Sequence, residues 1–184
     1  MSTETASLFF AILALAAWAG TLATATLLIA ARRSVSPTII GLRSDVGRSA
    51  LTLAWIVALV TTLGSLYYSE IAHFTPCKLC WYQRIAMYPL ALLLGIAAFR
   101  RDRNIRIYVI AQCAVGAAIA AYHSFIQAFP PEGGTSFCTL DAPCTERYVW
   151  EFGFVSLPFM ALACCAFITT MMFLARRSQG DLDG

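Results

Sequence analysis

Charged residues are scarce in this sequence. Asp, Glu, Lys and Arg make up 12% of its 184 residues, whereas hydrophobic residues make up 59% and the mean hydropathy is +0.70. A typical soluble domain carries roughly 25% charged residues, so the composition argues against water as the main solvent. The sequence also lacks low-complexity tracts and repeats of solenoid length, which excludes a repeat architecture and leaves a single domain.

Alternating strands are missing as well. No apolar stretch shows the polar–apolar alternation that is typical of a membrane β-barrel strand. The sequence instead contains five long apolar runs, at 8–31, 50–68, 81–99, 107–125 and 152–175. Each run is close to the ~20 residues that an α-helix needs to cross a bilayer. Because helices satisfy their own backbone hydrogen bonds, the sequence predicts an all-α integral membrane protein with five spanning helices.

Basic residues are lacking before the first apolar run. The N-terminal segment MSTETAS contains Glu4 and no Lys or Arg, whereas a secretory signal peptide begins with a positively charged region. The basic pair Arg32 and Arg33 follows the run instead. We therefore expect 8–31 to be an uncleaved membrane helix with its N-terminus outside the cytoplasm; a cleaved signal peptide is the alternative.

Basic residues are divided unequally between the two sides of the predicted bundle. Ten of the 13 Lys and Arg residues lie in the 32–48 loop, the 100–106 loop and the C-terminal tail. The other side holds Lys78, Arg84 and Arg147. Since the side rich in Lys and Arg remains in the cytoplasm, segments 69–80 and 126–151 are predicted to be extracytoplasmic. Around the end of the second segment, Trp150, Phe152 and Phe154 are placed as an interfacial aromatic belt would be.

The seven cysteines divide by position. Four lie in the segments predicted to be extracytoplasmic, where disulfides form and persist; they are Cys77, Cys80, Cys138 and Cys144. The other three fall inside predicted helices, where we expect them to pack as small apolar residues; they are Cys113, Cys164 and Cys165.

The first extracytoplasmic pair forms a Cys-X-X-Cys motif at the start of the third predicted helix. One thiol of such a motif often has a lowered pKa, favoured by a helix N-terminus and a nearby cation. Arg84 follows Cys80 by four residues, so it shares a helix face with Cys80, about 6 Å deeper. A cation there can stabilise a thiolate or a developing anionic oxygen on a ligand. The alternative is a structural disulfide beside an arginine that extends to the interface.

The second pair, Cys138 and Cys144, lies six positions apart with Pro143 between. It can close a small loop, either as a structural staple or as an exchangeable disulfide that a partner's thiolate opens. The four cysteines could also bind Zn²⁺. Zinc ribbons usually pair two tight Cys-X-X-Cys units, however, so no metal site is expected.

His123 lies near the outer end of the fourth predicted helix. Because the third and fourth helices are antiparallel, His123 and Arg84 could lie at similar depth. Ionisable groups inside membranes tend to face the bundle and mark function, so His123 is a candidate site residue. An interfacial histidine in contact with water or headgroups is the alternative, and Glu70 is expected to be a loop or interface residue.

The stretch PCKLCWYQRIAMYPL, residues 76–90, resembles the disulfide-bond formation protein B (DsbB) family, most closely its BdbC-type branch. GSLYYSE before it and CTERYVWEFGFVSLPF after the second pair resemble the same branch. The order of the two pairs fits as well, whereas the vitamin K epoxide reductase family has its loop pair first. The resemblance implies a four-helix transmembrane bundle of the DsbB type at 49–177. This bundle is flanked by an N-terminal helix with a cytoplasmic linker (1–48), which has no counterpart in that scheme, and by a cytoplasmic tail (178–184).

The resemblance also implies an activity. Family members are multi-pass proteins of the bacterial cytoplasmic (inner) membrane that reoxidise an extracytoplasmic thioredoxin-like thiol oxidase of the DsbA/BdbD type. They pass its electrons to a membrane quinone, menaquinone or ubiquinone. Membrane lipid is a further expected partner, and no nucleic acid is expected. The alternatives are a quinone reductase of the vitamin K type, and a membrane scaffold or transporter subunit with purely structural loop disulfides.

The site residues carry over by motif. Cys138 would be attacked by the partner and Cys144 would then exchange with Cys77. Cys80 would face the quinone, with Arg84 beside a quinone oxygen and His123 as a further quinone-binding residue. The family's glutamate before that arginine is Gln83 here. Two disulfide patterns remain open for the resting protein. One has bonds 77–80 and 138–144, and the other has a rearranged bond such as 77–144.

Overall fold

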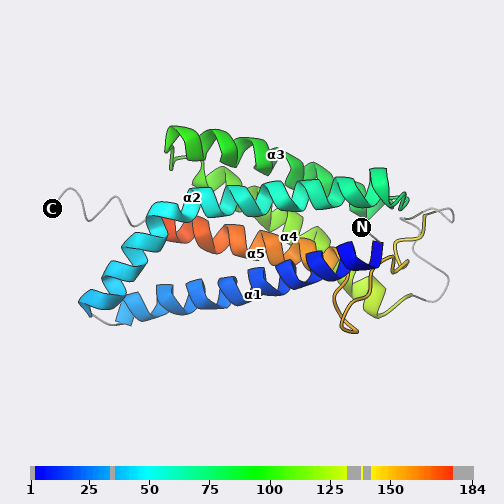
Figure 1. Ribbon diagram of the computed structural model, residues 1–184, viewed down its shortest axis with the longest axis horizontal. Helices are drawn as coiled ribbons and strands as arrows, with labels where there is room; N and C mark the ends of the chain where they lie inside the picture. The colour runs from blue at the N-terminus through cyan, green and yellow to red at the C-terminus, as the bar shows by residue number, and fades with distance from the viewer. Residues whose placement is uncertain (1–2, 34–35, 132–137, 139–141, 176–184) are drawn as a thin grey trace.

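The computed structural model describes residues 3–33, 36–131, 138 and 142–175 (Figure 1). Five helices in these ranges are long and apolar enough to cross a membrane. They are α1 (Thr3–Arg33), α2 (Pro37–Leu66), α3 (Lys78–Arg100), α4 (Arg106–Ala128) and α5 (Leu157–Ala175). The predicted all-α membrane architecture is therefore confirmed. The predicted tail at 178–184 lies outside the described residues.

The helices run along one long axis, with α5 in the middle of the bundle (Figure 1). Helix α5 packs against α1, α2 and α4, while α3 packs against α2 and α4. Half of the most apolar window of α5 is buried, against 17% for α1. This difference follows from the sequence of α5, which is apolar on all sides as befits a central helix. Helix α1 packs mainly on α5 and much less on α2.

The main core lies between α2, α3, α4 and α5. Its largest fully buried side chains include Leu90 and Leu94 of α3, Val109 of α4, and Ile168 and Met172 of α5. A second apolar cluster joins the first half of α1 to the start of α5 and to the segment before it; Ala11, Ala14, Val155 and Met160 belong to it. Helix α1 is thus held in the bundle by packing against α5 and the segment before it.

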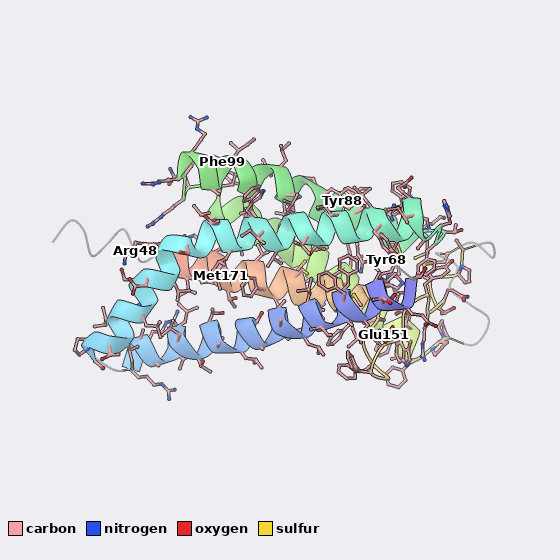
Figure 2. All side chains as sticks on the ribbon, in the orientation of Figure 1. Arg48, Tyr68, Tyr88, Phe99, Glu151 and Met171 are labelled. Carbon is pink, nitrogen blue, oxygen red and sulfur yellow. A yellow bond between two sulfur atoms is a disulfide. The ribbon has the colours of Figure 1, made fainter. Side chains whose placement is uncertain are left out.

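Helix α2 begins 13 residues before the apolar run that predicted it, so most of the predicted 32–48 loop is helical. Pro37 occupies the first helical turn, where a missing backbone N–H has no cost. The helix changes direction near Arg48 (Figure 2). Gly47 and Ser49 flank that residue, and such small residues commonly accompany a bend. Asp45 and Arg48 form an exposed ion pair on this first segment.

The fifth span begins at Leu157, so its predicted start at residue 152 was wrong. Residues Phe152 and Gly153 have positive φ values of 53° and 77°, which no helix tolerates. Glu151 and Val155 instead close a tight turn through two backbone hydrogen bonds. Phe152 and its neighbours Trp150 and Phe154 remain exposed.

Candidate functional site

The four cysteines of the two pairs lie at one end of the bundle, which we call the cysteine end. Helix α3 starts there at Lys78, α4 ends there at Ala128, and α5 starts there. Tyr68 and Glu151 mark this end, and Phe99 marks the opposite end (Figure 2). A short π-helix, η1 (Tyr67–Ile71), closes α2 at the cysteine end. Such π-turns are frequent at functional sites.

Cys77 is the N-cap residue of α3. Its sulfur accepts a hydrogen bond from the backbone N–H of Cys80 at 3.4 Å, one of the unpaired donors of the first helical turn. The Sγ atoms of Cys77 and Cys80 lie 3.2 Å apart as two unbonded thiols. Cys77 is only 4% exposed, whereas Cys80 is partly exposed. In this motif Cys77 is therefore buried and Cys80 is accessible.

The pKa of the Cys77 thiol is lowered well below its ordinary value. The main cause is the hydrogen bond with the Cys80 thiol, which stabilises a thiolate at Cys77. Burial opposes this shift, while a hydrogen bond with His123 and the Cys80 backbone N–H support it. The dithiol state thus holds a thiolate at neutral pH, as exchange chemistry requires.

We expect this thiolate to be visible by spectroscopy. Because the folded pKa of Cys77 is depressed, the thiolate persists as the pH falls through the range where an unperturbed thiol (pKa ~8.5) becomes protonated. In reduced protein in detergent, thiolate absorbance at 240 nm should remain at about pH 6 and disappear only in more acidic solution. Cys77→Ser should remove that absorbance and Cys113→Ala should not. A wild type with no thiolate absorbance left at about pH 6 would contradict this prediction.

The second pair is bonded. Cys138 and Cys144 form a disulfide with their Cα atoms 5.9 Å apart. Cys144 is 1% exposed and shares one apolar cluster with Cys77, Leu79 and Ile126. Cys138 lies at the edge of this cluster and is partly exposed. The accessible member of the second pair is therefore Cys138, while its partner sulfur is packed beside the first pair.

His123 of α4 connects the two pairs. Its Nε2 atom lies 3.8 Å from Cys77 Sγ and 3.0 Å from the carbonyl oxygen of Cys144. At the second distance a protonated Nε2 donates a hydrogen bond to the carbonyl. The side chain is 2% exposed. His123 thus contacts the Cys77 sulfur of the first pair and the Cys144 backbone of the second, a position that spacing along the sequence does not reveal.

Two further residues, Gln127 and Arg147, fix the segment after Cys144, and sequence reasoning missed both as site residues. The amide nitrogen of Gln127 donates to the carbonyl of Glu146 at 2.8 Å. Arg147 donates through Nε and a terminal nitrogen to the carbonyl of Gln127, and its guanidinium stacks over Trp150. The only signal in the sequence is the positive charge of Arg147, which bears on membrane orientation and does not indicate a site.

Arg84 is held against α2. Its Nε donates to Ser65 Oγ and a terminal nitrogen donates to the Ser65 carbonyl, both at 3.2 Å. Tyr88 donates to the same Ser65 hydroxyl at 3.0 Å. The guanidinium also lies 5.3 Å from the centre of the Trp81 ring, within reach of a cation–π interaction. The charge of Arg84 is therefore positioned before any ligand binds.

A cavity of about 380 Å³ begins beside Cys80 and Arg84 and extends between α1, α2, α3 and α5. Its end near the cysteines has polar groups, whereas its deeper part is lined by apolar side chains such as Val57 and Phe167. His123 does not line it. It lines a much smaller cavity with Cys77 and Cys80. Cys80 is thus the cysteine that borders both spaces.

Gln83 adds an unexpected polar group to the large cavity. It lines the cavity, is 8% exposed, and its amide nitrogen has no hydrogen-bond partner among the described residues. A buried donor without a partner is costly, so this amide is a candidate ligand contact. The sequence signal was the departure from the family's glutamate at this position.

Cys77, Cys80 and His123 also lie close enough together to ligate one metal ion. Their ligand atoms all lie within 4.8 Å of one another. This set differs from the four-cysteine set that the sequence raised, because His123 comes from another helix. A metal would occupy the same sulfur lone pairs that disulfide exchange uses, so metal binding and exchange exclude one another here.

Residues 47–175 match the family described as "Disulfide bond formation protein DsbB". The chain is 47% identical over 131 residues to "Disulfide bond formation protein C" of Bacillus subtilis, covering 71% of this chain and 95% of that relative. It is 46% identical over 125 residues to "Probable disulfide formation protein C 1" of Bacillus anthracis, covering 65% and 90%. It is 38% identical over 127 residues to "Probable disulfide formation protein" of Coxiella burnetii, covering 68% and 86%. No solved structure matches.

Proposed function

The chain belongs to the DsbB family of disulfide bond formation proteins, and we propose that it reoxidises an extracytoplasmic thioredoxin-like dithiol oxidase and passes the electrons to a membrane quinone. The observation that carries this proposal is the position of Cys80. It lies within a sulfur–sulfur contact of Cys77 and borders the cavity between the helices. Electrons that reach the first pair therefore arrive beside a space whose deeper, apolar lining suits a lipid-soluble acceptor.

The exchange begins at the accessible sulfur of the second pair. A thiolate of the partner attacks Cys138, the Cys138–Cys144 bond breaks, and the Cys144 sulfur leaves as a thiolate. That thiolate attacks Cys77 in a Cys77–Cys80 disulfide, and the Cys80 sulfur leaves with the electron pair. Cys144 and Cys77 pack in one cluster, so this transfer needs little rearrangement.

The partner's second thiolate then releases Cys138 by forming the partner's own disulfide. Cys138 attacks Cys144, restores the Cys138–Cys144 bond and releases Cys77. Two electrons and two protons have moved from the partner to the Cys77–Cys80 dithiol. The structure has the bonding pattern of this state, with a bonded second pair and two free thiols in the first.

His123 assists this exchange in our proposal. A protonated Nε2 faces the Cys77 sulfur and stabilises negative charge there, while its contact with the Cys144 carbonyl keeps the attacking residue close. These contacts favour a role at the junction of the two pairs. Direct quinone binding by His123 stays a prediction.

The residues that line the large cavity fit a quinone. A quinone supplies a two-electron, two-proton acceptor that regenerates the Cys77–Cys80 disulfide. Arg84 brings a fixed cation and Gln83 an unpaired amide donor, and both suit a carbonyl oxygen that gains negative charge. The apolar deeper part suits the hydrocarbon chain of the same molecule.

The orientation of the protein is proposed on charge. Arg100, Arg101, Arg103 and Arg106 lie at or next to the turn between α3 and α4, at the end opposite the cysteines. The side rich in arginine stays in the cytoplasm. The cysteine end would then face the extracytoplasmic space, where the partner is found.

The test is quinone reduction by the purified protein in detergent. With a reduced thioredoxin-like dithiol protein as donor, we expect one quinone reduced per partner disulfide formed, followed by quinone absorbance. Cys113→Ala, which changes a buried cysteine outside the site, should retain this activity. If neither menaquinone nor ubiquinone is reduced while all four site cysteines stay oxidised, the oxidase proposal fails. A membrane scaffold with structural disulfides would then be favoured.

A further inference from the structure

We propose that α1 forms the binding surface for the isoprenoid chain of the quinone. This inference rests on the proposed function, because it assigns a role to the deeper part of the same cavity. Helix α1 supplies Phe10, Leu13, Ala14, Ala16 and Ala17 to the cavity wall. None of these carries a polar side chain, so α1 offers contacts to a hydrocarbon chain and no hydrogen bond to a headgroup.

The charged and unpaired polar groups of the cavity lining lie at the cysteine end, whereas the deeper Thr61 hydroxyl already donates to the Val57 carbonyl. Cys80, Gln83 and Arg84 lie in the first two turns of α3 at the cysteine end. From that end the lining of α5 continues from Leu157 to Phe167, which spans about 15 Å at 1.5 Å per residue. An amphiphile with a polar ring and a long apolar chain matches this division, with its ring near the sulfur and its chain along the deeper wall.

Two glycines bring aromatic rings to the boundaries of this space. A Cβ atom on Gly20 of α1 would lie 2.7 Å from the Phe167 ring, so the missing side chain lets Phe167 pack onto α1 at the deep end. A Cβ atom on Gly64 of α2 would lie 3.0 Å from the Phe10 ring, so Phe10 reaches across from α1 to α2. Phe10 and Phe167, which both line the cavity, therefore lie near the two ends of its α1 wall.

The cysteine end of α1 is anchored where the site lies. The Tyr68 hydroxyl in η1 donates to Ser7 Oγ at 3.3 Å, and both residues are buried. The rings of Phe10 and Tyr68 lie 5.7 Å apart. Tyr68 also lines the cavity. Helix α1 is therefore fixed to the wall that α2 and η1 provide, although it packs little on α2 elsewhere.

This wall is an addition to the part of the chain shared with relatives. The family match begins at residue 47, after α1. The match to the Bacillus subtilis relative covers 95% of that protein and 71% of this chain, which leaves that relative no room for a comparable helix. In this chain α1 adds a further wall to the space between α2, α3 and α5, and the isoprenoid chain gains a protein surface on that side.

The test fills the space from α1 without changing the residues beside the sulfur. Ala17→Phe places a ring in the cavity, and Ala23→Phe, on an exposed position of the same helix, is the matched control. Binding of a menaquinone with a long isoprenoid chain is compared with binding of menadione, which has the same ring and no chain. Quenching of intrinsic tryptophan fluorescence gives the Kd, and the corresponding ubiquinone pair is measured in parallel.

We expect Ala17→Phe to weaken binding of the long-chain quinone roughly tenfold, equivalent to about 1.4 kcal/mol, and to change menadione binding less than about twofold. Ala23→Phe should bind both quinones as the wild type does. If the Tm without quinone shows that Ala17→Phe does not fold, Ala16→Phe replaces it.

Equal binding of the long-chain quinone by Ala17→Phe and Ala23→Phe would overturn the inference, as would an equal loss for both kinds of quinone. Equal binding by the two variants is the result expected if a lipid chain, and not the isoprenoid chain, occupies the space. A wild-type protein that binds neither quinone would overturn the proposed function together with this inference. Wild-type quinone reduction with no effect at Ala17 would overturn the inference alone.

Discussion

Cys80→Ser is expected to stop quinone reduction while leaving the reaction with the protein partner intact. Serine cannot form the Cys77–Cys80 disulfide, so the Cys144 thiolate has no bond to attack after the partner has opened the second pair. Steady-state turnover should fall roughly a thousandfold or more, as for loss of a nucleophile in other enzymes. Cys138 remains reactive, so a partner variant with a single cysteine, which lacks the thiolate that would release Cys138, should still form a mixed disulfide with it that is visible on a non-reducing gel.

Cys138→Ser provides the contrast. This variant should lose both quinone reduction and the mixed disulfide, because the accessible sulfur of the second pair is gone. Cys113→Ala serves as the control in both assays. Continued turnover in Cys80→Ser would contradict the relay, and a mixed disulfide in Cys138→Ser would show that the partner attacks another cysteine.

Arg84→Ala is expected to lower kcat/KM for the quinone about a hundredfold, the usual cost of losing one fixed electrostatic donor at a site of developing charge. The side chain is held by two hydrogen bonds to Ser65, so its charge is already in place in the free protein. The KM for the dithiol partner should not change, because Arg84 lines the large cavity and lies away from Cys138. Initial rates with each substrate varied in turn give both constants.

Arg84→Lys and Ser65→Ala refine this experiment. Lysine keeps the charge but cannot reproduce the two-point contact with Ser65, so an intermediate loss is expected. Ser65→Ala removes one hydrogen bond to the guanidinium and one to Tyr88, and should weaken quinone use less than Arg84→Ala. Equal losses for quinone and partner in Arg84→Ala would point to a general structural role and contradict the assignment.

The helices could be predicted from the sequence because apolar length alone determines whether a segment can cross a bilayer. Their ends could not. Pro37 begins α2 within a polar stretch, and the positive φ values at Phe152 and Gly153 delay α5 to Leu157. Both ends are fixed by local backbone geometry, which hydropathy does not register.

The candidate site was predictable where it follows helix periodicity. Cys77, Cys80 and Arg84 lie within two turns of one helix, so their proximity follows from spacing. The contact between His123 and the Cys144 carbonyl depends on how the irregular segment around Cys144 folds back over α4. Such a segment has no sequence periodicity from which its path could be predicted. The wall that α1 contributes was equally hidden, because its alanines and glycines show only that packing is close and do not indicate which neighbour they meet.

The burial of Cys77 and Cys144 has a consequence for which reductants the protein can use. Small soluble thiols can approach Cys138 but find Cys77 only 4% exposed and Cys144 only 1% exposed. A small monothiol could form a mixed disulfide with Cys138, but a second molecule would have to arrive to release it. A docked dithiol protein carries that second thiolate within the same complex. In the proposed relay, the buried Cys77 and Cys144 sulfurs would thus shield the electron acceptor from small thiols at the cysteine end.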